Sequence, residues 1–532
     1  MLLRLHPRPL AATPSYEFTV SFMGVLFGTL TGVRRCLWFH EPPLQLAEVW
    51  AHGPAWCLRR LLLGLLAATA LTGLAEAQTL KIGLRQDPDI LDPTLGSSYV
   101  GRIVYAAMCD KLFDLDTDLN IIPQLATGYR YEDPTHLVIT LRPGVVFHDG
   151  EKLDAEAVKY KLTRDLTAKG SMRAGEINAI QAIEVIDPLT IRLVLKAPAS
   201  PLLAQLTDRA GIMISPKATE AAGAAFGQKP VCAGPYAFVE RVAQDHITLK
   251  RHGGYWNPSE YHFDQVVYSS IPNSAVRVAN LRAGSLDLVE YILPTDVEAI
   301  RKDPALRIAM TNSLAYTGIT FNTGNGPAAK SVAGQSALVR RAFELAIDKK
   351  ALVDVVFNGA FSPTAQANPP SSPMYVKEIV SPARDVARAQ ALLKQAGVAL
   401  PVAIVLTATN EPDSQQAAEV IQSMTREAGF DVKIRTMEFA ASLTAGYGGD
   451  FEAYLIGWSG RSDADGNMWQ MLHTGGTFNY GHYSHPAVDG LLDEARTFAD
   501  AARRREIYAK VWQQEREDLP LVYLWNPQNI VG

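Results

Sequence analysis

Apolar residues alternate with polar ones in several short stretches of the N-terminal half, a pattern typical of strands that bury one face. Thr79–Leu84 alternates as a first strand. Ile183–Val185 and Leu189–Leu195 predict a hairpin around the Asp187-Pro188 turn. Ile247–Leu249 repeats the alternation before a glycine-rich loop. This half is therefore predicted to be mixed, with antiparallel hairpins and few helices.

Beyond residue 272 the apolar spacing changes to that of helices alternating with strands. Ala351–Phe357 reads as a helix, with Asp348 as its N-cap. Farther on, strand Val402–Leu406 precedes a helix with apolar residues at 417, 420, 421 and 424, and strand Val432–Ile434 follows it. Strand, helix and strand in this order predict a βαβ-type lobe.

A decapeptide, Leu141–Gly150, joins these local signals most densely. It begins at the end of an alternating strand, contains a Pro-Gly turn, and ends in a second turn at Asp149-Gly150. Asp154 then occupies the N-cap position of a helix whose apolar stripe is Val158, Leu162 and Leu166. None of these residues is arranged for chemistry.

The chain has 532 residues, so two or three domains are expected rather than one core. Hydrophobic residues make up 48% and charged residues 20%, which is ordinary for a globular protein. A formal net charge of -5 gives no reason to expect nucleic acid or an anionic membrane as a partner.

The N-terminal region predicts export. Arg59-Arg60, the apolar run Leu61–Ala70 and Ala75-Glu76-Ala77 form the three parts of a signal peptide over residues 58–77, with cleavage after Ala77. The alternative is a membrane anchor, but the apolar run is shorter than the ~20 residues that a span needs. No cysteine follows the run to carry a lipid, so the product is expected in the periplasm.

Residues 1–57 do not fit in front of a signal peptide. We interpret them as a spurious or non-structural extension, because Met1 and Met23 are the only methionines before Met108. The competing interpretation is that Phe18–Val33 is an anchor, although that run is short and contains several glycines and threonines.

Cys109 and Cys232 are the two cysteines that remain after the leader is removed. In an oxidising compartment they are a candidate disulfide, with two buried free thiols as the alternative. Closing a loop of roughly 120 residues contributes about 4–5 kcal/mol in the chain-entropy model.

Motifs along the whole mature chain resemble the bacterial solute-binding proteins of the dipeptide/oligopeptide class, family 5. Each motif alone is weak, but their order and spacing together are specific. The matching segments are Leu141–Gly150, Cys232–Phe238, Gly254–Asn257, Ile271–Asn273 with Arg277, Leu281–Asp287, Val339–Phe343, Ala346–Asp348, Ala391–Gly397 and Tyr483–Asp489.

The resemblance implies an α/β, periplasmic-binding-protein-like two-lobed clamp (type II). Lobe one would hold residues 79–272, with an extra subdomain at about 116–207, and lobe two residues 273–517. Residues 518–532 would return a strand, Leu521–Leu524, to lobe one. Family members usually continue for about twenty residues after Trp525, so we expect the C-terminus to be truncated. Such proteins deliver a peptide or peptide-like ligand to ABC permease subunits in the inner membrane.

The loop Gly457–Asn467 leaves the carboxyl end of a predicted strand, where ligand clefts form in α/β lobes. Many peptide-binding relatives place an Asp here for the ammonium group, whereas this chain has Arg461. The loop after Val402–Leu406 also lacks the Arg that dipeptide binders use for the carboxylate. We therefore hypothesise a ligand with an acidic group held by Arg461. In the alternative, Arg461 pairs with Asp463 or Asp465.

Aromatic and neutral polar residues complete the candidate ligand-binding set. Trp458, Trp469, Tyr99 and Tyr316 are candidates for the pocket wall, with core packing as the alternative. Ser97 and Asn410 could donate neutral hydrogen bonds to the ligand backbone, and Asp463 is included as part of the Arg461 loop.

Enzyme and metal signatures are weak. His482, His485 and His473 have a spacing that zinc sites can use, but Pro486 and the lack of a completing ligand favour surface histidines. Ser459 lacks the second glycine of a nucleophile elbow, and no cofactor motif is present. We expect a monomeric, non-catalytic protein without cofactor or nucleic-acid partner. Alternatives are an opine-like conjugate, a glutathione-like peptide or a nickel chelate as ligand, a chemoreceptor as recipient, and a secreted hydrolase.

Overall fold

The computed structural model describes residues 78–532; the predicted extension (1–57) and signal peptide (58–77) lie outside the described residues. Helices and sheets are mixed throughout this region, as the α/β expectation requires. Among residues 78–532, no helix combines the length and apolarity needed to cross a membrane.

A five-stranded sheet, ordered β11-β1-β10-β9-β8, forms the base of lobe one. The first strand lies inside this sheet, parallel to both of its neighbours, and the other pairs are antiparallel. The predicted strand at 79–84 is confirmed. The strands are β1 (Thr79–Leu84), β8 (Tyr236–Val242), β9 (His246–Arg251), β10 (Gln265–Ser270) and β11 (Leu288–Val289).

A separate antiparallel sheet, ordered β4-β5-β7-β6, lies within residues 116–207, the range expected for an extra subdomain. Helix α4 (Ala155–Thr167) begins at Asp154, whose side chain accepts from the Ala157 amide, and Val158 and Leu162 are buried as the apolar stripe predicts. The strands are β4 (Ala126–Asp133), β5 (His136–Leu141), β6 (Ile180–Asp187) and β7 (Thr190–Leu195).

A six-stranded sheet, ordered β14-β18-β13-β17-β15-β16, forms the centre of lobe two. β15 is parallel to β16, and helix α14 (Pro412–Arg426) connects them, so the predicted βαβ unit is confirmed. The strands are β13 (Tyr316–Phe321), β14 (Ser362–Pro363), β15 (Val402–Thr409), β16 (Phe430–Met437), β17 (Ala453–Trp458) and β18 (Leu521–Asn526).

The C-terminal strand corrects the expected division of the chain. Leu521–Leu524 belongs to β18, which lies between β14 and β13 in lobe two and not in lobe one. All six residues of β18 are buried, so they need an interior strand position with both faces covered. The lobe-one sheet also extends beyond residue 272, because β11 pairs with β1.

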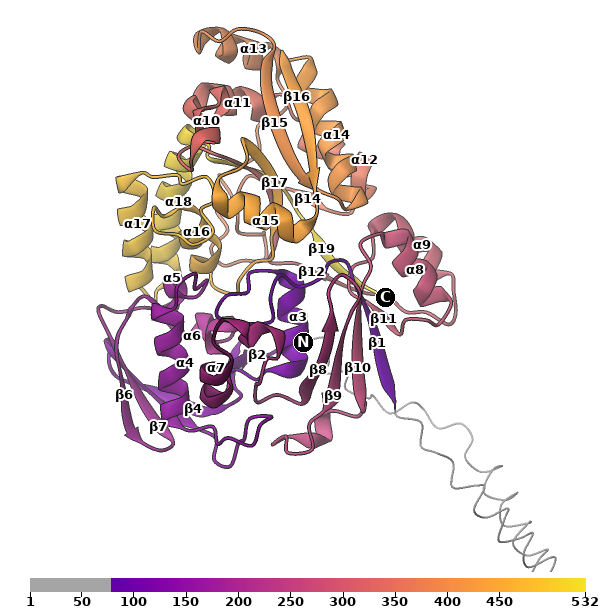
Figure 1. Cartoon of the computed structure of the whole chain (residues 1–532). Helices are drawn as coiled ribbons and strands as arrows, with labels where there is room; N and C mark the ends of the chain where they lie inside the picture. Colours follow the sequence, from indigo (N-terminus) through magenta and orange to yellow (C-terminus); the bar gives the residue numbers. More distant parts are fainter. Residues whose placement is uncertain (1–77) are drawn as a thin grey trace, which may run out of the picture. The chain divides into compact units, whose positions relative to one another are not determined.

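Two crossing segments connect the lobes and pair with each other (Figure 1). Outgoing β12 (Ala309–Asn312) is antiparallel to returning β19 (Gln528–Val531). Gly532 and Val289 then exchange backbone hydrogen bonds, so the end of the chain extends the lobe-one sheet. The two lobes are thus joined by a short β-ladder rather than by single strands.

Helices cover the sheets of both lobes (Figure 1). The other elements are β2 (Phe113–Leu115), β3 (Ile121–Pro123), α3 (Tyr99–Met108), α5 (Ala174–Ile177), α6 (Leu202–Gln205), α7 (Pro216–Ala222), α8 (Ser274–Arg282), α9 (Val297–Arg301), α10 (Val332–Gln335), α11 (Ala337–Leu345), α12 (Lys349–Phe357), α13 (Val386–Gln395), α15 (Phe439–Gly448), α16 (Asp465–Leu472), α17 (Pro486–Thr497) and α18 (Ala501–Asp518), with 3-10 turns at η2 (Arg209–Gly211), η3 (Gly223–Gln228), η4 (Pro258–Glu260), η5 (Pro294–Asp296) and η6 (Pro327–Lys330).

The predicted disulfide between Cys109 and Cys232 is confirmed, with the two Cα atoms 4.9 Å apart. His148, from the decapeptide, lies beside it. Its Nε2 donates to the Gly234 carbonyl at 3.0 Å, and its Nδ1 accepts from the Cys232 amide at 3.4 Å. The decapeptide therefore has a structural role, which is to fix the disulfide-bearing segment to the subdomain.

Candidate functional site

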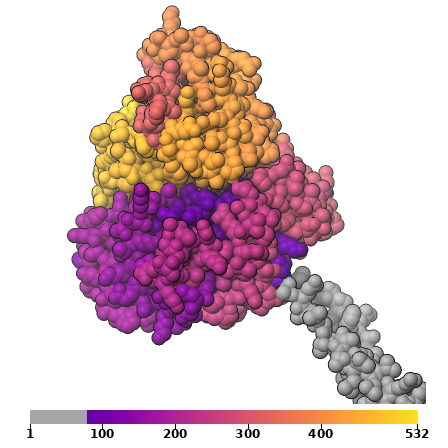
Figure 2. Space-filling model, viewed as in Figure 1, coloured from indigo at the N-terminus to yellow at the C-terminus, as the bar shows by residue number. Residues whose placement is uncertain are grey.

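The lobes meet around the loop that follows β17. Arg102 of lobe one donates to the Gly460 carbonyl at 3.4 Å, and Gln86 of lobe one donates to Glu411 of lobe two. Figure 2 shows this junction between the purple and magenta residues of lobe one and the orange and yellow residues of lobe two. The candidate site is built on the side chains along it.

Asn467 fixes the conformation of the loop that carries Arg461. Its Oδ1 accepts from the Arg461 amide at 2.7 Å and from Trp458 Nε1 at 3.0 Å. Gly460 has a φ of 77°, and a Cβ there would lie 2.3 Å from the Leu314 carbonyl oxygen, so only glycine fits. The loop therefore presents Arg461 from a rigid support.

Arg461 points across the junction into lobe one. Its Nε lies 2.8 Å from Asp208 Oδ2, and its Nη2 lies 3.6 Å from Glu176 Oε1. Trp458 lies against the guanidinium, with the ring centroid 4.3 Å from Cζ, a cation-π distance. Arg461 is only 5% exposed, so these contacts replace water almost completely.

Three lobe-one arginines surround the same carboxylates. Arg102 Nε lies 3.1 Å from Asp208 Oδ1, and Arg209 Nε lies 3.7 Å from that oxygen. Arg173 donates to Glu176 at 2.8 Å. We call these residues the arginine cluster: Arg102, Arg173, Arg209 and Arg461, with Asp208 and Glu176.

The arginine cluster is a charged and poorly hydrated environment. Burial, opposed by Asp208 and reinforced by Arg102, lowers the pKa of Arg461 to about 9. Burial and the repulsion of Arg173 likewise lower the pKa of Arg209 to about 10. Although burial acts to raise it, the attraction of Arg102 and Arg461 holds the pKa of Asp208 well below its usual range.

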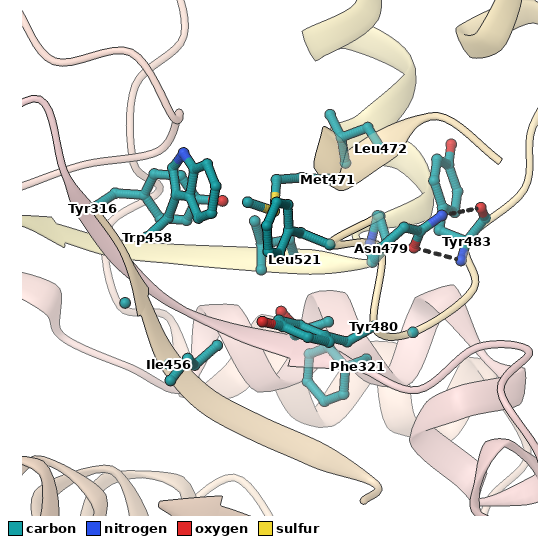
Figure 3. A pocket seen from close by; sticks show the side chains of 15 residues that line it. Tyr316, Phe321, Ile456, Trp458, Met471, Leu472, Asn479, Tyr480, Tyr483 and Leu521 are labelled. Atoms are coloured by element: carbon teal, nitrogen blue, oxygen red, sulfur yellow. Dashed lines mark hydrogen bonds between the residues drawn. The ribbon is translucent and has the colours of Figure 1, made fainter. Parts of the chain in front are cut away.

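Trp458 and Tyr316 line a small cavity inside lobe two (Figure 3). Its volume is about 30 Å³, which is room for one or two waters and too little for a dipeptide. Tyr316 is 3% exposed and packs edge-on against Tyr523. Tyr316 thus lies in the core, whereas Trp458 also reaches the arginine cluster.

Ser97, Tyr99 and Asn410 lie in different surroundings. The Ser97 hydroxyl donates to Asp89 at 2.7 Å, so that interaction already uses its proton. Tyr99 lies between Arg85 and Arg102, whose Cζ atoms are 5.9 and 6.0 Å from its ring centroid. Asn410 is exposed at the end of β15. Tyr99 and Ser97 both border the arginine cluster, because the Gly96 and Ser98 carbonyls on either side of Ser97 accept from Arg209.

Asp463 and Trp469 are held within lobe two. Asp463 accepts two hydrogen bonds from Arg504, at 2.5 and 2.7 Å. Asp465, the other partner considered for Arg461, pairs instead with Arg496 at 2.7 Å. Trp469 donates to Asp493 at 2.9 Å, and His473 stacks on its ring. Arg461 therefore pairs with neither Asp463 nor Asp465.

A second set of charged residues at the lobe junction was not predicted from the sequence. Glu411 accepts from Gln86 and from Thr409, and Asp413 accepts from Tyr291 at 3.1 Å. Burial raises the pKa of Glu411, with Asp413 acting in the same direction and Arg85 against it. We call Glu290, Glu411 and Asp413, with Arg85 and Arg277, the acidic cluster.

The histidines considered for metal binding are separate from both clusters. His485 caps α17, its side chain accepting from the Val488 amide, and His473 lies 3.5 Å from Asp493. Across residues 78–532, no group of three or more His, Cys, Asp or Glu side chains is arranged to hold a metal ion.

No spacing in the sequence links the lobe-one members of the arginine cluster. Arg102, Arg173 and Asp208-Arg209 come from three segments that only the fold brings together. One weak signal was available, because the charged pair Asp208-Arg209 stands between the apolar stretches Leu202–Leu206 and Ile212–Ile214. Charges flanked in this way are candidates for a buried pair.

Comparisons with known proteins agree with this architecture. The model of bacterial extracellular solute-binding proteins, family 5 middle, matches residues 120–479. The glutathione-binding protein GsiB of Pectobacterium atrosepticum is 28% identical over 447 residues, which cover 82% of this chain and 86% of that protein. Di/tripeptide-binding protein 1 of Pseudomonas aeruginosa is 26% identical, over 75% of this chain and 80% of its own length.

A solved structure is similar over nearly the same range. The binding protein AgaA of A. tumefaciens R10, in complex with agropinic acid, superposes with a TM-score of 0.77 at 28% identity. The alignment covers 85% of this chain and 92% of AgaA.

Two α/β lobes joined by paired crossing strands define a periplasmic binding protein fold. Because the family model matches more than half of the chain, the chain belongs to the family 5 bacterial extracellular solute-binding proteins. The resemblance found in the sequence is thereby confirmed. Members of this family bind solutes for ABC importers, which is the general role of this protein.

Proposed function

We propose that this protein captures a peptide-like solute with an acidic group at the junction of its lobes. It delivers the intact solute to the permease subunits of an ABC importer in the inner membrane. The protein acts as a monomeric, non-catalytic carrier in the periplasm, and closure of the lobes gives the form that the permease recognises.

The excess of buried positive charge around Arg461 carries this proposal. Four guanidinium groups face only two carboxylates, and three of the four arginines are 5% exposed or less. Burying an uncompensated charge is costly, so an anionic partner is favoured at this place. A planar carboxylate suits the donor fork of arginine.

The names of the relatives fit an acidic solute. GsiB is named for glutathione and AgaA was solved with agropinic acid, and both compounds carry carboxyl groups. A γ-linked peptide or an opine-like conjugate is therefore preferred here over an unmodified dipeptide. No observation in the described region favours the nickel chelate, the chemoreceptor or the hydrolase alternative.

The test begins with the natural solute. The protein is purified from periplasmic extract without denaturation, and the solute released on unfolding is identified by mass spectrometry. We expect an intact peptide-like compound with at least one acidic group. A solute without an acidic group, or one converted to a product on incubation with the protein, would contradict the proposal.

Affinity measurements then test whether Arg461 holds the solute. In calorimetric titration with the released solute and with glutathione, Arg461→Ala should weaken binding by at least about tenfold, or ~1.4 kcal/mol. Arg505→Ala is the matched control, because Arg505 is an exposed arginine on α18. A smaller loss in Arg461→Ala, or an equal loss in the control, would remove Arg461 from the site.

A further inference from the structure

The arginine cluster contains two more positive than negative charges. Arg173, Arg209 and Arg461 are buried, and Arg102 keeps 27% of its side chain exposed. Asp208 and Glu176 neutralise two of these four charges. Asp89, another lobe-one carboxylate nearby, accepts from Ser97 and Ser98 instead of from an arginine.

Several donors in this cluster have no acceptor. Arg461 Nη2 and Arg209 Nη2 are buried without a hydrogen bond, and so is the Nε of Arg209. The Nε atoms of Arg173 and Arg461 also lack a hydrogen bond, and so do two acceptors, Glu176 Oε2 and Asp208 Oδ2, so five unmet donor atoms face two unmet acceptor atoms. Unmade hydrogen bonds of buried charged donors are costly, so these atoms indicate where a further acceptor binds.

Arg209 and Arg461 lie next to each other from opposite lobes. Their Nε atoms lie 3.7 and 2.8 Å from the two oxygens of the single Asp208 carboxylate. Arg209 is fixed in place, because its Nη1 donates to the carbonyls of Gly96 and Ser98, each at 3.2 Å. The Asp208 carboxylate thus lies beside both guanidinium groups, and their Nη2 atoms, which lack an acceptor, remain for a second anionic group.

We propose that the solute presents two negative charges at this place, one held by Arg461 of lobe two and the other by Arg209 of lobe one. This inference rests on the proposed function and specifies its solute class as a dianionic group, either two neighbouring carboxylates or a phosphate. A monoanion leaves one positive charge of the cluster uncompensated. Since Arg102 is still partly hydrated, the second charge contributes less than the first.

Isosteric probes test the second charge by calorimetric titration of the whole purified protein. Ala-Asp carries two carboxylates in its last residue, Ala-Asn carries one at the same size, and Ala-phosphoserine supplies the phosphate. We expect Ala-Asp or Ala-phosphoserine to bind at least about tenfold more tightly than Ala-Asn. Their relative affinity shows whether carboxylates or phosphate are preferred.

Variants then assign that charge to Arg209. Arg209→Gln should reduce the preference for the dianion to about threefold or less, while the affinity for Ala-Asn stays within about threefold of the wild type. Arg505→Gln should leave both affinities unchanged. Should Arg209→Gln fail to fold, the wild-type preference must still fall as salt is added, because it is electrostatic.

The outcomes distinguish a failure of this inference from a failure of the proposed function. Equal binding of Ala-Asp, Ala-Asn and Ala-phosphoserine by the wild type would overturn this inference and leave the proposed function standing. If none of the three dipeptides binds at millimolar concentration, this inference is overturned. If glutathione and the solute released on unfolding do not bind either, the proposed function itself fails.

Discussion

The two charged clusters at the lobe junction differ in the sign of their excess charge and in which arginine atoms lack a hydrogen bond. In the acidic cluster, three carboxylates face two arginines, and both oxygens of Glu411 accept hydrogen bonds from the protein. The buried arginine atoms without a hydrogen bond there are Nε of Arg85 and Nε of Arg277. In the arginine cluster, four arginines face two carboxylates, and the terminal Nη2 atoms of Arg209 and Arg461 also lack an acceptor. Excess positive charge together with unmet terminal donors therefore favours the arginine cluster as the place where an anionic solute binds.

The largest expected effect comes from Asp208→Asn. It removes one of two counter-charges from the arginine cluster, so the free energy of unfolding at pH 7 should fall by about 3–5 kcal/mol. The folded-state pKa of Asp208 is depressed, so its stabilisation is complete above about pH 4 and is lost as the pH falls through the folded pKa. Urea unfolding across this pH range checks both statements.

Asp463→Asn is the control for Asp208→Asn. Asp463 pairs with Arg504 inside lobe two, so it should lower stability without changing the affinity for an acidic solute. Equal effects of the two variants on solute affinity would erase the distinction between the junction and the lobe interior.

A double-mutant cycle sharpens the role of the inter-lobe pair. Asp208→Asn and Arg461→Gln should be non-additive by about 2 kcal/mol in urea unfolding, because their side chains lie 2.8 Å apart in a buried setting. A coupling below about 0.5 kcal/mol would mean that the other arginines replace Arg461 beside Asp208.

His148 lies outside both charged clusters, and its protonation is a separate cause of lost stability in acid. Burial lowers the pKa of His148 to about 4, and a proton on Nδ1 would face the Cys232 amide proton. Stability is therefore complete above about pH 6.5 and should fall by on the order of 2 kcal/mol between pH 6.5 and 4. His148→Asn should flatten this slope, whereas His262→Gln, at an exposed site, should not.

The smallest expected effect is a gain in the free energy of unfolding, in contrast to the losses predicted above. Because burial raises the folded pKa of Glu411, its ionised form costs stability at pH 7. Glu411→Gln should raise the free energy of unfolding by about 1 kcal/mol at pH 7, and the gain should vanish below about pH 4, where the wild type is protonated. Thermal unfolding with the exposed Glu419→Gln as control checks it. A clear loss of stability would show that the Glu411 charge holds the lobes together.

The fold was predictable from the sequence because its signals are local. The alternation in Thr79–Leu84, the cap at Asp154 and the βαβ order around Val402–Leu406 each depend on neighbours in the chain. The position of Leu521–Leu524 was not, since a buried strand carries no mark of the sheet that it joins.

The candidate site was predictable only in part. Arg461 stood out as a departure from relatives in a loop that leaves a strand end, and the structure brings it to the junction. Its partners Asp208 and Glu176 lie hundreds of residues away, and a charge pair formed by folding leaves no spacing to detect. Trp458 reaches the same cluster, whereas Asp463 and Trp469 pair inside lobe two.

The carbonyls of Gly96 and Ser98, which hold Arg209 and Arg173, have a kinetic consequence. The lobe-one half of the cluster is ordered by the fold itself, so little side-chain freedom is left to lose when a solute arrives. Association rates should then be similar for different anionic solutes. The residence time, set by how often lobe two moves away from lobe one, would then distinguish tightly bound solutes from weakly bound ones.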